Sequence, residues 1–369
     1  MKRKICAAAL AAGLLLFAGC SVQTVTPFSA DWQQNPSVYD RNFYEKTEYS
    51  VSFERGESFA GGVVFQPGEG SAFTVTVEAV PAQDGHYQLY RLTSTLTLAG
   101  SYIYLGEDGQ ESEVVAFGGE SGNAPGRIER TALFSSPHEG NLEPLESSST
   151  IYSYTPVAQN SRAVEVYSYG YTVKYTDGGS RATATYTDGF AGLTEAESAI
   201  NAATRKVSVF AEGMLPEGEI AIDGIQSRYT GIDEAYLLFA GRGITYASDA
   251  STPLTVDGGG SARAVSLRGT AGSYSAAGEK SFTLDGEAVE DEAIESVVVS
   301  ARLADGGTNS GPMQTAVYAL PDQADADGNA QGNLYYALPL EVRQAFGFSG
   351  TSAQIVYTLK TVTHTNVEA

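Results

Sequence analysis

The feature that most restricts how this 369-residue chain folds is a set of nine Asp-Gly pairs spread from residue 84 to residue 328. A type I′ turn needs positive φ at both central residues, and Asp-Gly meets that need readily. Between the pairs lie short runs that alternate apolar and polar residues, such as residues 73–79 and 297–302. Alternation of this kind is typical of strands with one buried face, so the sequence predicts antiparallel hairpins. The pairs begin at Asp84, Asp108, Asp177, Asp188, Asp223, Asp257, Asp285, Asp305 and Asp327.

One long helix is predicted, over residues 193–205. Thr194 and Glu197 form a capping box at its start, and Arg205 lies where the helix dipole is negative. A second, shorter helical turn is expected over residues 340–346. Its signals are a proline just before it and a glycine just after it.

The predicted fold is therefore all-β, with two antiparallel β domains and one helix near the middle of the chain. Each domain is expected to be a curved sheet, as in a half-barrel, or a sandwich. The first spans residues 37–192, the helix over 193–206 marks the boundary, and the second spans 207–369. Parallel sheets would need more helical crossovers than the sequence offers.

The first twenty residues have the pattern of an export signal. A basic start is followed by an uncharged, mostly apolar run over residues 5–19, which is short for a permanent transmembrane helix. The run ends in Leu16-Phe17-Ala18-Gly19-Cys20, which resembles the lipobox of bacterial lipoproteins, although Phe17 stands where an aliphatic residue is usual. The resemblance implies that residues 1–20 are a lipoprotein signal and that Cys20 is acylated. An ordinary cleaved signal or an uncleaved anchor is the alternative.

This reading predicts a localisation outside the cytoplasm. The lipid on Cys20 would hold the chain on the outer face of the plasma membrane, or on the outer membrane of a Gram-negative cell. Residues 21–36 are polar and are expected to be a tether. Cys6 would be removed and Cys20 blocked, which leaves no thiol for a disulfide, a nucleophile or a metal.

The charge balance excludes one class of partner. Forty-four acidic residues against 22 basic residues give a net charge of -22. Because nucleic-acid binding depends on clustered cations, a nucleic-acid partner is not expected. The same charge repels anionic headgroups, so membrane attachment is expected to come from the lipid alone.

The candidate ligand-binding residues form a tyrosine stripe on one predicted strand: Tyr167, Tyr169, Tyr171 and Tyr175. Tyr186 is expected to face them from the next strand. Aromatic rings with hydroxyl groups suit sugar rings or an apolar ligand. The favoured alternative is an ordinary sheet face, half covered by the helix or by another sheet.

Two acidic segments raise the question of metal or acid–base chemistry. Asp325, Asp327 and Asn329 alternate as calcium ligands can, but an EF-hand-type loop needs Gly and Glu where this chain has Ala330 and Tyr336. A solvated loop is favoured, and no metal is predicted. The acidic run over residues 285–295 is likewise expected to be a solvated face.

No motif for catalysis or cofactor binding is found. His86, His138 and His364 lie far apart in the sequence, and serine-hydrolase, zinc and phosphate-loop patterns are missing. The chain is therefore expected not to be an enzyme and to carry no cofactor. The alternative is a cell-wall or glycan hydrolase that uses paired carboxylates.

Two further segments, residues 232–243 and 355–360, resemble parts of uncharacterised bacterial lipoproteins. The first combines an acidic pair, an apolar stretch and Arg242. Such proteins are similar in fold to the lipoprotein-carrier group, in which a curved antiparallel sheet wraps a helix and holds acyl chains. The resemblance implies a curved sheet. The function expected from the whole sequence is binding of an apolar or glycan ligand, or of an envelope partner protein.

Overall fold

The computed structural model describes residues 43–56, 61–81, 88–106, 108–136, 143–156, 162, 164–176, 181–187, 218–221, 242, 249–255, 262–303, 315–320, 338–346 and 353–366. This part of the chain is all-β, as the sequence predicts. Its strands form one 16-stranded sheet and one 3-stranded sheet. Within these ranges the helical structure is a single 3₁₀ turn, η4 (Gly278–Lys280). None of the helices searched there is long and apolar enough to cross a membrane.

The strands in the first part of the chain are β1 (Phe43–Arg55), β2 (Gly62–Pro67), β3 (Ala72–Val80), β4 (Gln88–Leu98), β5 (Gly100–Leu105), β6 (Glu111–Phe117), β7 (Gly126–Ser136), β8 (Glu143–Pro156), β9 (Val164–Thr176), β10 (Arg181–Thr187) and β11 (Gly218–Ala221). Those in the second part are β12 (Asp249–Thr255), β13 (Ala262–Ala276), β14 (Phe282–Leu284), β15 (Glu287–Val289), β16 (Glu292–Leu303), β17 (Thr315–Ala319), β18 (Pro339–Ala345) and β19 (Ala353–Asn366).

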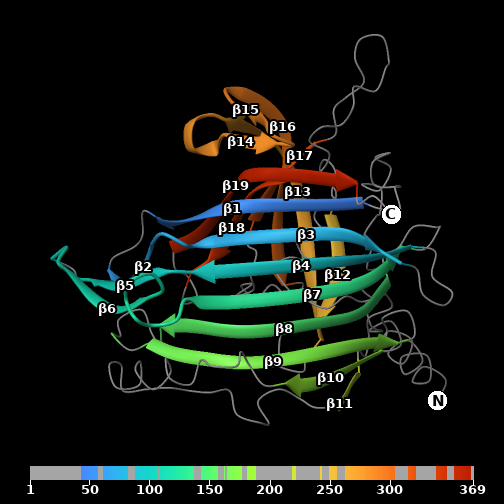
Figure 1. Cartoon of the computed structure of the whole chain (residues 1–369), viewed down its shortest axis with the longest axis horizontal. Coiled ribbons are helices and arrows are strands. Elements are labelled where there is room, and N and C mark those ends of the chain that lie inside the picture. Colours follow the sequence, from blue (N-terminus) through green and yellow to red (C-terminus); the bar gives the residue numbers. More distant parts are fainter. Residues whose placement is uncertain are drawn as a thin grey trace, which may run out of the picture.

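The first and last of these strands pair with each other in the middle of the large sheet (Figure 1). The strand order is β11-β10-β9-β8-β7-β4-β3-β1-β19-β18-β17-β16-β13-β12. One arm of the sheet therefore grows outward from β1 and the other from β19. The two ends of the path, β11 and β12, follow each other in sequence. Because a single sheet contains strands from both halves of the chain, the β1–β19 ladder is the joint between them.

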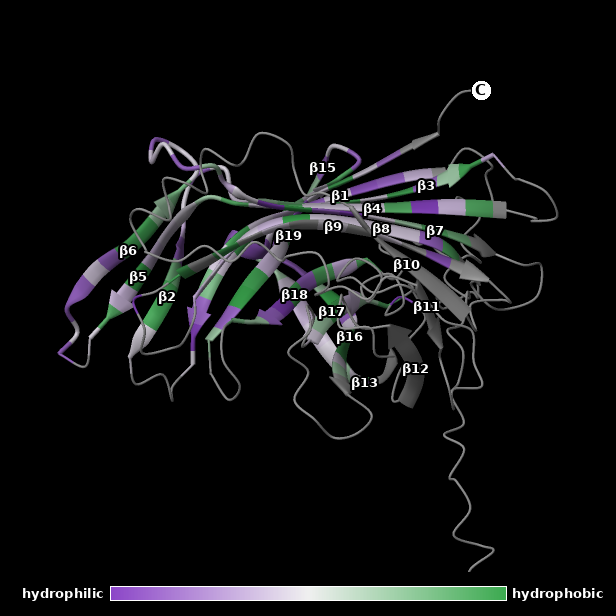
Figure 2. Cartoon of the chain, turned by 90° about the horizontal axis from the view of Figure 1, so that it is seen from below, coloured by the Kyte–Doolittle hydropathy of each residue, from purple (hydrophilic) through white to green (hydrophobic). Residues whose placement is uncertain are grey.

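The sheet bends strongly, so that β13 lies beneath β4, β7 and β8 in the view of Figure 2. Hydrophobic and hydrophilic residues alternate along its strands in the same view. In β3, Phe73, Val75 and Val77 are buried, and in β16 the same holds for Val297 and Val299. The predicted alternation is confirmed in both strands.

One face of the sheet carries a continuous line of apolar residues, which we call the apolar row. In consecutive strands its members are direct register partners: Leu359, Tyr49, Phe73, Leu96, Ile128 and Ile151. All but Ile128 are at most 4% exposed, and Ile128 packs against the core. We call the face that carries this row the inner face. Leu359 and Tyr49 place it at the β1–β19 joint.

Two of the Asp-Gly pairs lie in the described part of the chain, and the predicted type I′ turn is confirmed at one of them. Asp285 and Gly286 join β14 to β15 with φ values of 51° and 88°, as a type I′ turn requires. At the other pair only Gly109 has positive φ, at 77°, whereas Asp108 does not, so that prediction is wrong there. Every Asp-Gly pair except the one at Asp223 lies between consecutive strands that pair antiparallel. Asp223 lies between β11 and β12, which are the two ends of the sheet.

The small sheet, with strand order β2-β5-β6, packs through aromatic side chains. The ring of Phe117 stacks on that of Tyr154 of β8, with 4.3 Å between the ring centroids. The rings of Tyr102 and Phe346 are also in contact, with 5.8 Å between their centroids. Gly100, at φ 139°, sits where β4 leads into β5. A Cβ there would meet the carbonyl oxygen of Gln66 at 2.1 Å, so only glycine fits.

One local prediction is wrong. Residues 340–346 do not form a helical turn, because Pro339–Ala345 is strand β18. Leu340 and Val342 are at most 1% exposed, and β18 pairs on one side with β17 and on the other with β19. Ladder bonds on both sides outweigh the local signal of a proline and a glycine.

The predicted helix at 193–206 lies outside the described residues. The division into domains 37–192 and 207–369 therefore stays a prediction. The predicted signal and tether, residues 1–36, lie outside as well.

Candidate functional site

Among the residues whose side chains the structure describes, three charged ones are buried: Glu45, Arg242 and Glu341. Each is at most 8% exposed. Since an uncompensated buried charge is costly, each of these groups needs partners, and such clusters are candidate functional sites. The two carboxylates belong to two separate clusters.

In the first cluster Glu45 of β1 binds Arg242 through both carboxylate oxygens. The Arg242 Nη1 atom donates to Oε2 at 3.3 Å, and Nη2 makes a short contact with Oε1. His364 of β19, the register partner of Glu45, places Nε2 at 3.2 Å from Oε2. A two-point guanidinium contact and an imidazole thus give both oxygens of this carboxylate a partner.

His364 also contacts the turn between β14 and β15. Its Nδ1 atom lies 2.9 Å from Asp285 Oδ2, and its backbone N–H donates to Asp285 Oδ1 at 2.6 Å. The imidazole therefore lies between two carboxylates, one buried and one exposed.

The pKa shifts follow from this geometry. Burial by itself raises the pKa of Glu45, but the charge of Arg242 and the hydrogen bonds from His364 and Arg242 outweigh it, so the pKa falls from 4.5 to about 2. Burial lowers the pKa of Arg242, but the charge and hydrogen bond of Glu45 raise it by more. The pKa is therefore above its usual range, and the guanidinium stays protonated. The pair is an ionic one.

Arg242 comes from the part of the chain between β11 and β12, the two ends of the sheet. Its ion pair with Glu45 connects that part to the joint strand β1. Arg242 is also the arginine of the segment that resembles bacterial lipoproteins. The structure gives it a structural partner.

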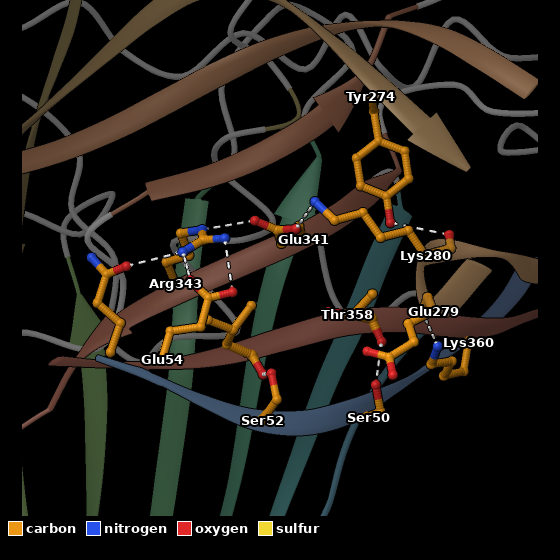
Figure 3. Close-up of polar contacts among 12 residues, drawn as sticks. Ser50, Ser52, Glu54, Tyr274, Glu279, Lys280, Glu341, Arg343, Thr358 and Lys360 are labelled. Atoms are coloured by element: carbon orange, nitrogen blue, oxygen red, sulfur yellow. Dashed lines mark hydrogen bonds and ion pairs between the residues drawn. The ribbon is translucent and has the colours of Figure 1, made fainter. Parts of the chain in front are cut away.

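The second cluster surrounds Glu341 of β18 (Figure 3). Lys280 Nζ and Arg343 Nε each lie 2.7 Å from one of its oxygens. The Nη1 atom of Arg343 also donates to Oε2 of Glu54 in β1 at 2.5 Å. Glu341 pairs in register with Thr358, which in turn pairs with Ser50, so this cluster lies on the face opposite the inner face.

The pKa of Glu341 is lowered. Burial acts in the opposite direction, but the hydrogen bond from Lys280 and the charge of Arg343 prevail. Both buried carboxylates are therefore held ionised by cations. A general acid needs the opposite arrangement, a carboxyl group whose pKa is raised.

The tyrosine stripe can be placed by backbone register. Ile151, the end of the apolar row, pairs with Tyr169, and Tyr171 pairs with Tyr186. Because register partners share a face, positions 167, 169, 171 and 175 lie on the inner face. The expected pairing with Tyr186 is confirmed. The side chains of the stripe lie outside the described part.

Burial changes sides along β8 and β9. In β8 the inner-face residues Ser149 and Ile151 are buried, but beyond them Tyr152 and Tyr154 are buried on the opposite parity. In β9, Val164 shares that opposite parity. The positions of the stripe therefore continue the inner face. The small sheet packs against the opposite face of the large sheet in this region, where Phe117 stacks on Tyr154.

The tyrosines of the core are structural. The hydroxyl of Tyr49 donates to the Pro339 carbonyl at 2.9 Å, and that of Tyr102 to the Tyr154 carbonyl at 2.7 Å. Burial raises the pKa of both phenols well above the usual range. They act as neutral donors inside the protein.

The remaining candidates divide into two groups. The acidic residues of the run 285–295 are exposed, as expected of a solvated face. The structure does not describe Cys20, His86, His138 or the possible calcium residues Asp325, Asp327 and Asn329. Among the residues it does describe, no group of three or more potential metal-ligating side chains occurs.

The Glu45 cluster is not among the sites that the sequence predicts. A signal was present, because Glu45 is in phase with Thr47 and Tyr49, the inward positions of β1. An acid in a buried phase implies a buried cation. Nothing local identifies that cation, since Arg242 lies 197 residues away.

Comparisons with known proteins give no family. No protein-family profile matches the chain, and no curated protein matches it. Among solved structures, it is similar to the crystal structure of a beta-barrel-like protein of the domain of unknown function DUF1849 from Brucella abortus. The identity is 7%, the TM-score is 0.41, and the match covers 88% of this chain and 99% of the other.

Replacing Arg242 with Met should leave Glu45 with His364 alone and cost about 3–5 kcal/mol of unfolding free energy. Urea unfolding measures this. Arg127→Met, which removes an exposed ion pair with Glu129, is the control and should cost at most about 1 kcal/mol. Equal effects of the two substitutions would show that the Glu45 cluster contributes no more than a surface pair.

Acid should remove the contribution of Glu45. Its pKa is about 2 in the folded chain and near 4.5 when unfolded, so the stabilisation is complete above pH 4.5 and is lost as the pH falls toward 2. In Glu45→Gln the free energy of unfolding should depend less on pH in this range. The control is Glu48→Gln, in which a half-buried residue of the same strand is replaced, and it should keep the wild-type slope.

Proposed function

We propose that this chain is a lipid-anchored extracytoplasmic protein that binds an apolar or glycan ligand, with the tyrosine stripe as its ligand face. The observation that carries the proposal is register. The apolar row crosses the sheet from Leu359 to Ile151 and leads directly to Tyr169. An aromatic continuation of an inner apolar face is a surface that suits acyl chains or sugar rings.

The proposed anchoring rests on the first twenty residues. A basic start, an apolar run and Cys20 in a lipobox-like context are what a lipoprotein signal requires. The high acidic charge fits attachment through lipid, since the protein surface itself would be repelled by anionic headgroups.

The two buried carboxylates among the described residues do not have the protonation state of a hydrolase's general acid. A glycan hydrolase needs one carboxyl group kept protonated near neutral pH. Glu45 and Glu341 are both held ionised by cationic partners.

A partner protein of the envelope is the other ligand class that the inner face could accept.

Replacing Tyr169 and Tyr171 together with Ser should weaken ligand binding about tenfold, because two aromatic contacts are lost. The probes are a dansyl-labelled fatty acid, followed by fluorescence, and an N-acetylglucosamine oligosaccharide, followed by calorimetry. The protein is the full chain purified from bacterial membranes in mild detergent.

Tyr44→Ser is the matched control. Tyr44 is half-buried and lies in β1 on the opposite parity from Tyr49, so its loss should leave binding unchanged. Binding of the fatty acid alone would assign the apolar class, and binding of the sugar alone the glycan class. Binding of neither probe, or equal loss in both variants, would contradict the proposed ligand face.

Replacing Cys20 with Ala should abolish metabolic labelling of the chain with radioactive palmitate and release it from the membrane fraction. The physical reason is that the acyl chains supply the anchoring energy. Cys6→Ala, in the segment to be removed, should label as the unmodified chain does. Palmitate labelling that persists in Cys20→Ala would refute the lipobox assignment.

A further inference from the structure

The hairpin β14–β15 is an accessory to the central ladder. On the side of β19 away from β1, β18 pairs with residues 354–358. Beyond that point β14 takes its place in parallel register, with Thr283 opposite Thr361 and Leu284 opposite Val362. The Asp285 backbone N–H continues the ladder by donating to the Val362 carbonyl at 2.9 Å. The hairpin therefore extends the sheet where β18 ends.

His364 lies where this hairpin meets β1. Nε2 faces Glu45 of β1 at 3.2 Å and Nδ1 faces Asp285 of the turn at 2.9 Å. A neutral imidazole has one N–H, whereas the imidazolium has two. Both carboxylates can accept a hydrogen bond from the ring only when the ring is protonated.

The charged surroundings are asymmetric. Glu45 keeps its contacts with Arg242 whatever the state of His364, because the guanidinium stays protonated. Asp285 keeps the backbone N–H of His364, and among the described residues its cationic partner is the imidazolium. The other acids of the hairpin, Glu287, Glu290 and Asp291, are exposed and add negative charge. Loss of the proton therefore weakens the hairpin side.

We propose that His364 is a proton-controlled latch, which fastens the β14–β15 hairpin to the central β1–β19 pair when protonated and loosens it when neutral. The latch is independent of the proposed ligand. It would make the attachment of this hairpin to the central strand β19 depend on pH.

The direction of the effect follows from the electrostatics. Burial lowers the pKa of His364, but the hydrogen bonds and charges of Glu45 and Asp285 raise it above the ordinary 6.5. A raised pKa means that the stabilisation is complete below pH 6.5 and is lost as the pH rises through the folded-state value.

Hydrogen exchange of the full chain tests the latch. Amide protection of residues 282–289, corrected for intrinsic exchange, should fall about tenfold between pH 6 and pH 9, while protection in β3 and β4 stays constant. In His364→Gln, which has no titrating ring, the hairpin should show a low protection that does not depend on pH.

Asp285→Asn separates the latch from the turn. Asn-Gly also forms type I′ turns, so the hairpin keeps its geometry while the hairpin carboxylate loses its charge. The pH dependence should shrink in this variant. Constant protection of 282–289 in the wild type, or an unchanged pH dependence in His364→Gln, would overturn the proposal, as would a His364 pKa below 6.5 by NMR.

Discussion

The pairing of β1 with β19 is the constraint on which the rest of the structure depends. The ladder runs from Phe43 opposite Asn366 to Arg55 opposite Ala353, with one shift of register after Glu48. These strands come from opposite ends of the described chain, so the loop that their pairing closes is nearly as long as the protein. Closing such a loop costs entropy that only the completed ladder and its packing repay. The strand of each arm that lies nearest the middle of the sheet, β1 or β19, therefore pairs with a strand from the other end of the sequence.

The buried charges reinforce this arrangement. Glu45 and Glu341 lie on opposite faces of the central strands, and each is neutralised by groups from distant segments. A slip of β1 by one residue would turn Glu45 to the other face and leave it without Arg242 and His364. Leaving a buried charge uncompensated is costly. The ion pairs thus make wrong registers unfavourable, even though they add little to the stability of the right one compared with an apolar replacement.

Local features of the fold could be read from the sequence because they depend on local chemistry. Alternation located the buried faces of β3 and β16, and Asp285-Gly286 adopts the predicted turn. The sequence predicts a helical turn where β18 lies, because Pro339 and Gly347 are helix signals that act locally. The strand forms because it pairs with β17 and β19, and these pairings leave no local signal. The order of strands could not be predicted for the same reason. It rests on long-range pairings that leave no pattern in a single sequence.

The site follows the same rule. The tyrosine stripe was visible as a period of two, and its pairing with Tyr186 is confirmed at the level of the backbone. Glu45 was detectable only as an acid in a buried phase. Its cation, Arg242, and the second role of His364 beside Asp285 emerge only when the strands are assembled.

The most direct test of the central claim is native-state hydrogen exchange of the full chain, with and without the substitution Leu359→Ala at the joint. Leu359 is 0% exposed, so its truncation should cost about 2–5 kcal/mol. If the β1–β19 ladder holds the sheet together, the slowest amides of β4 and β7 in one arm and of β13 and β16 in the other should all lose that same amount. If one arm keeps its protection while the other loses it, the arms are independent and the account is wrong.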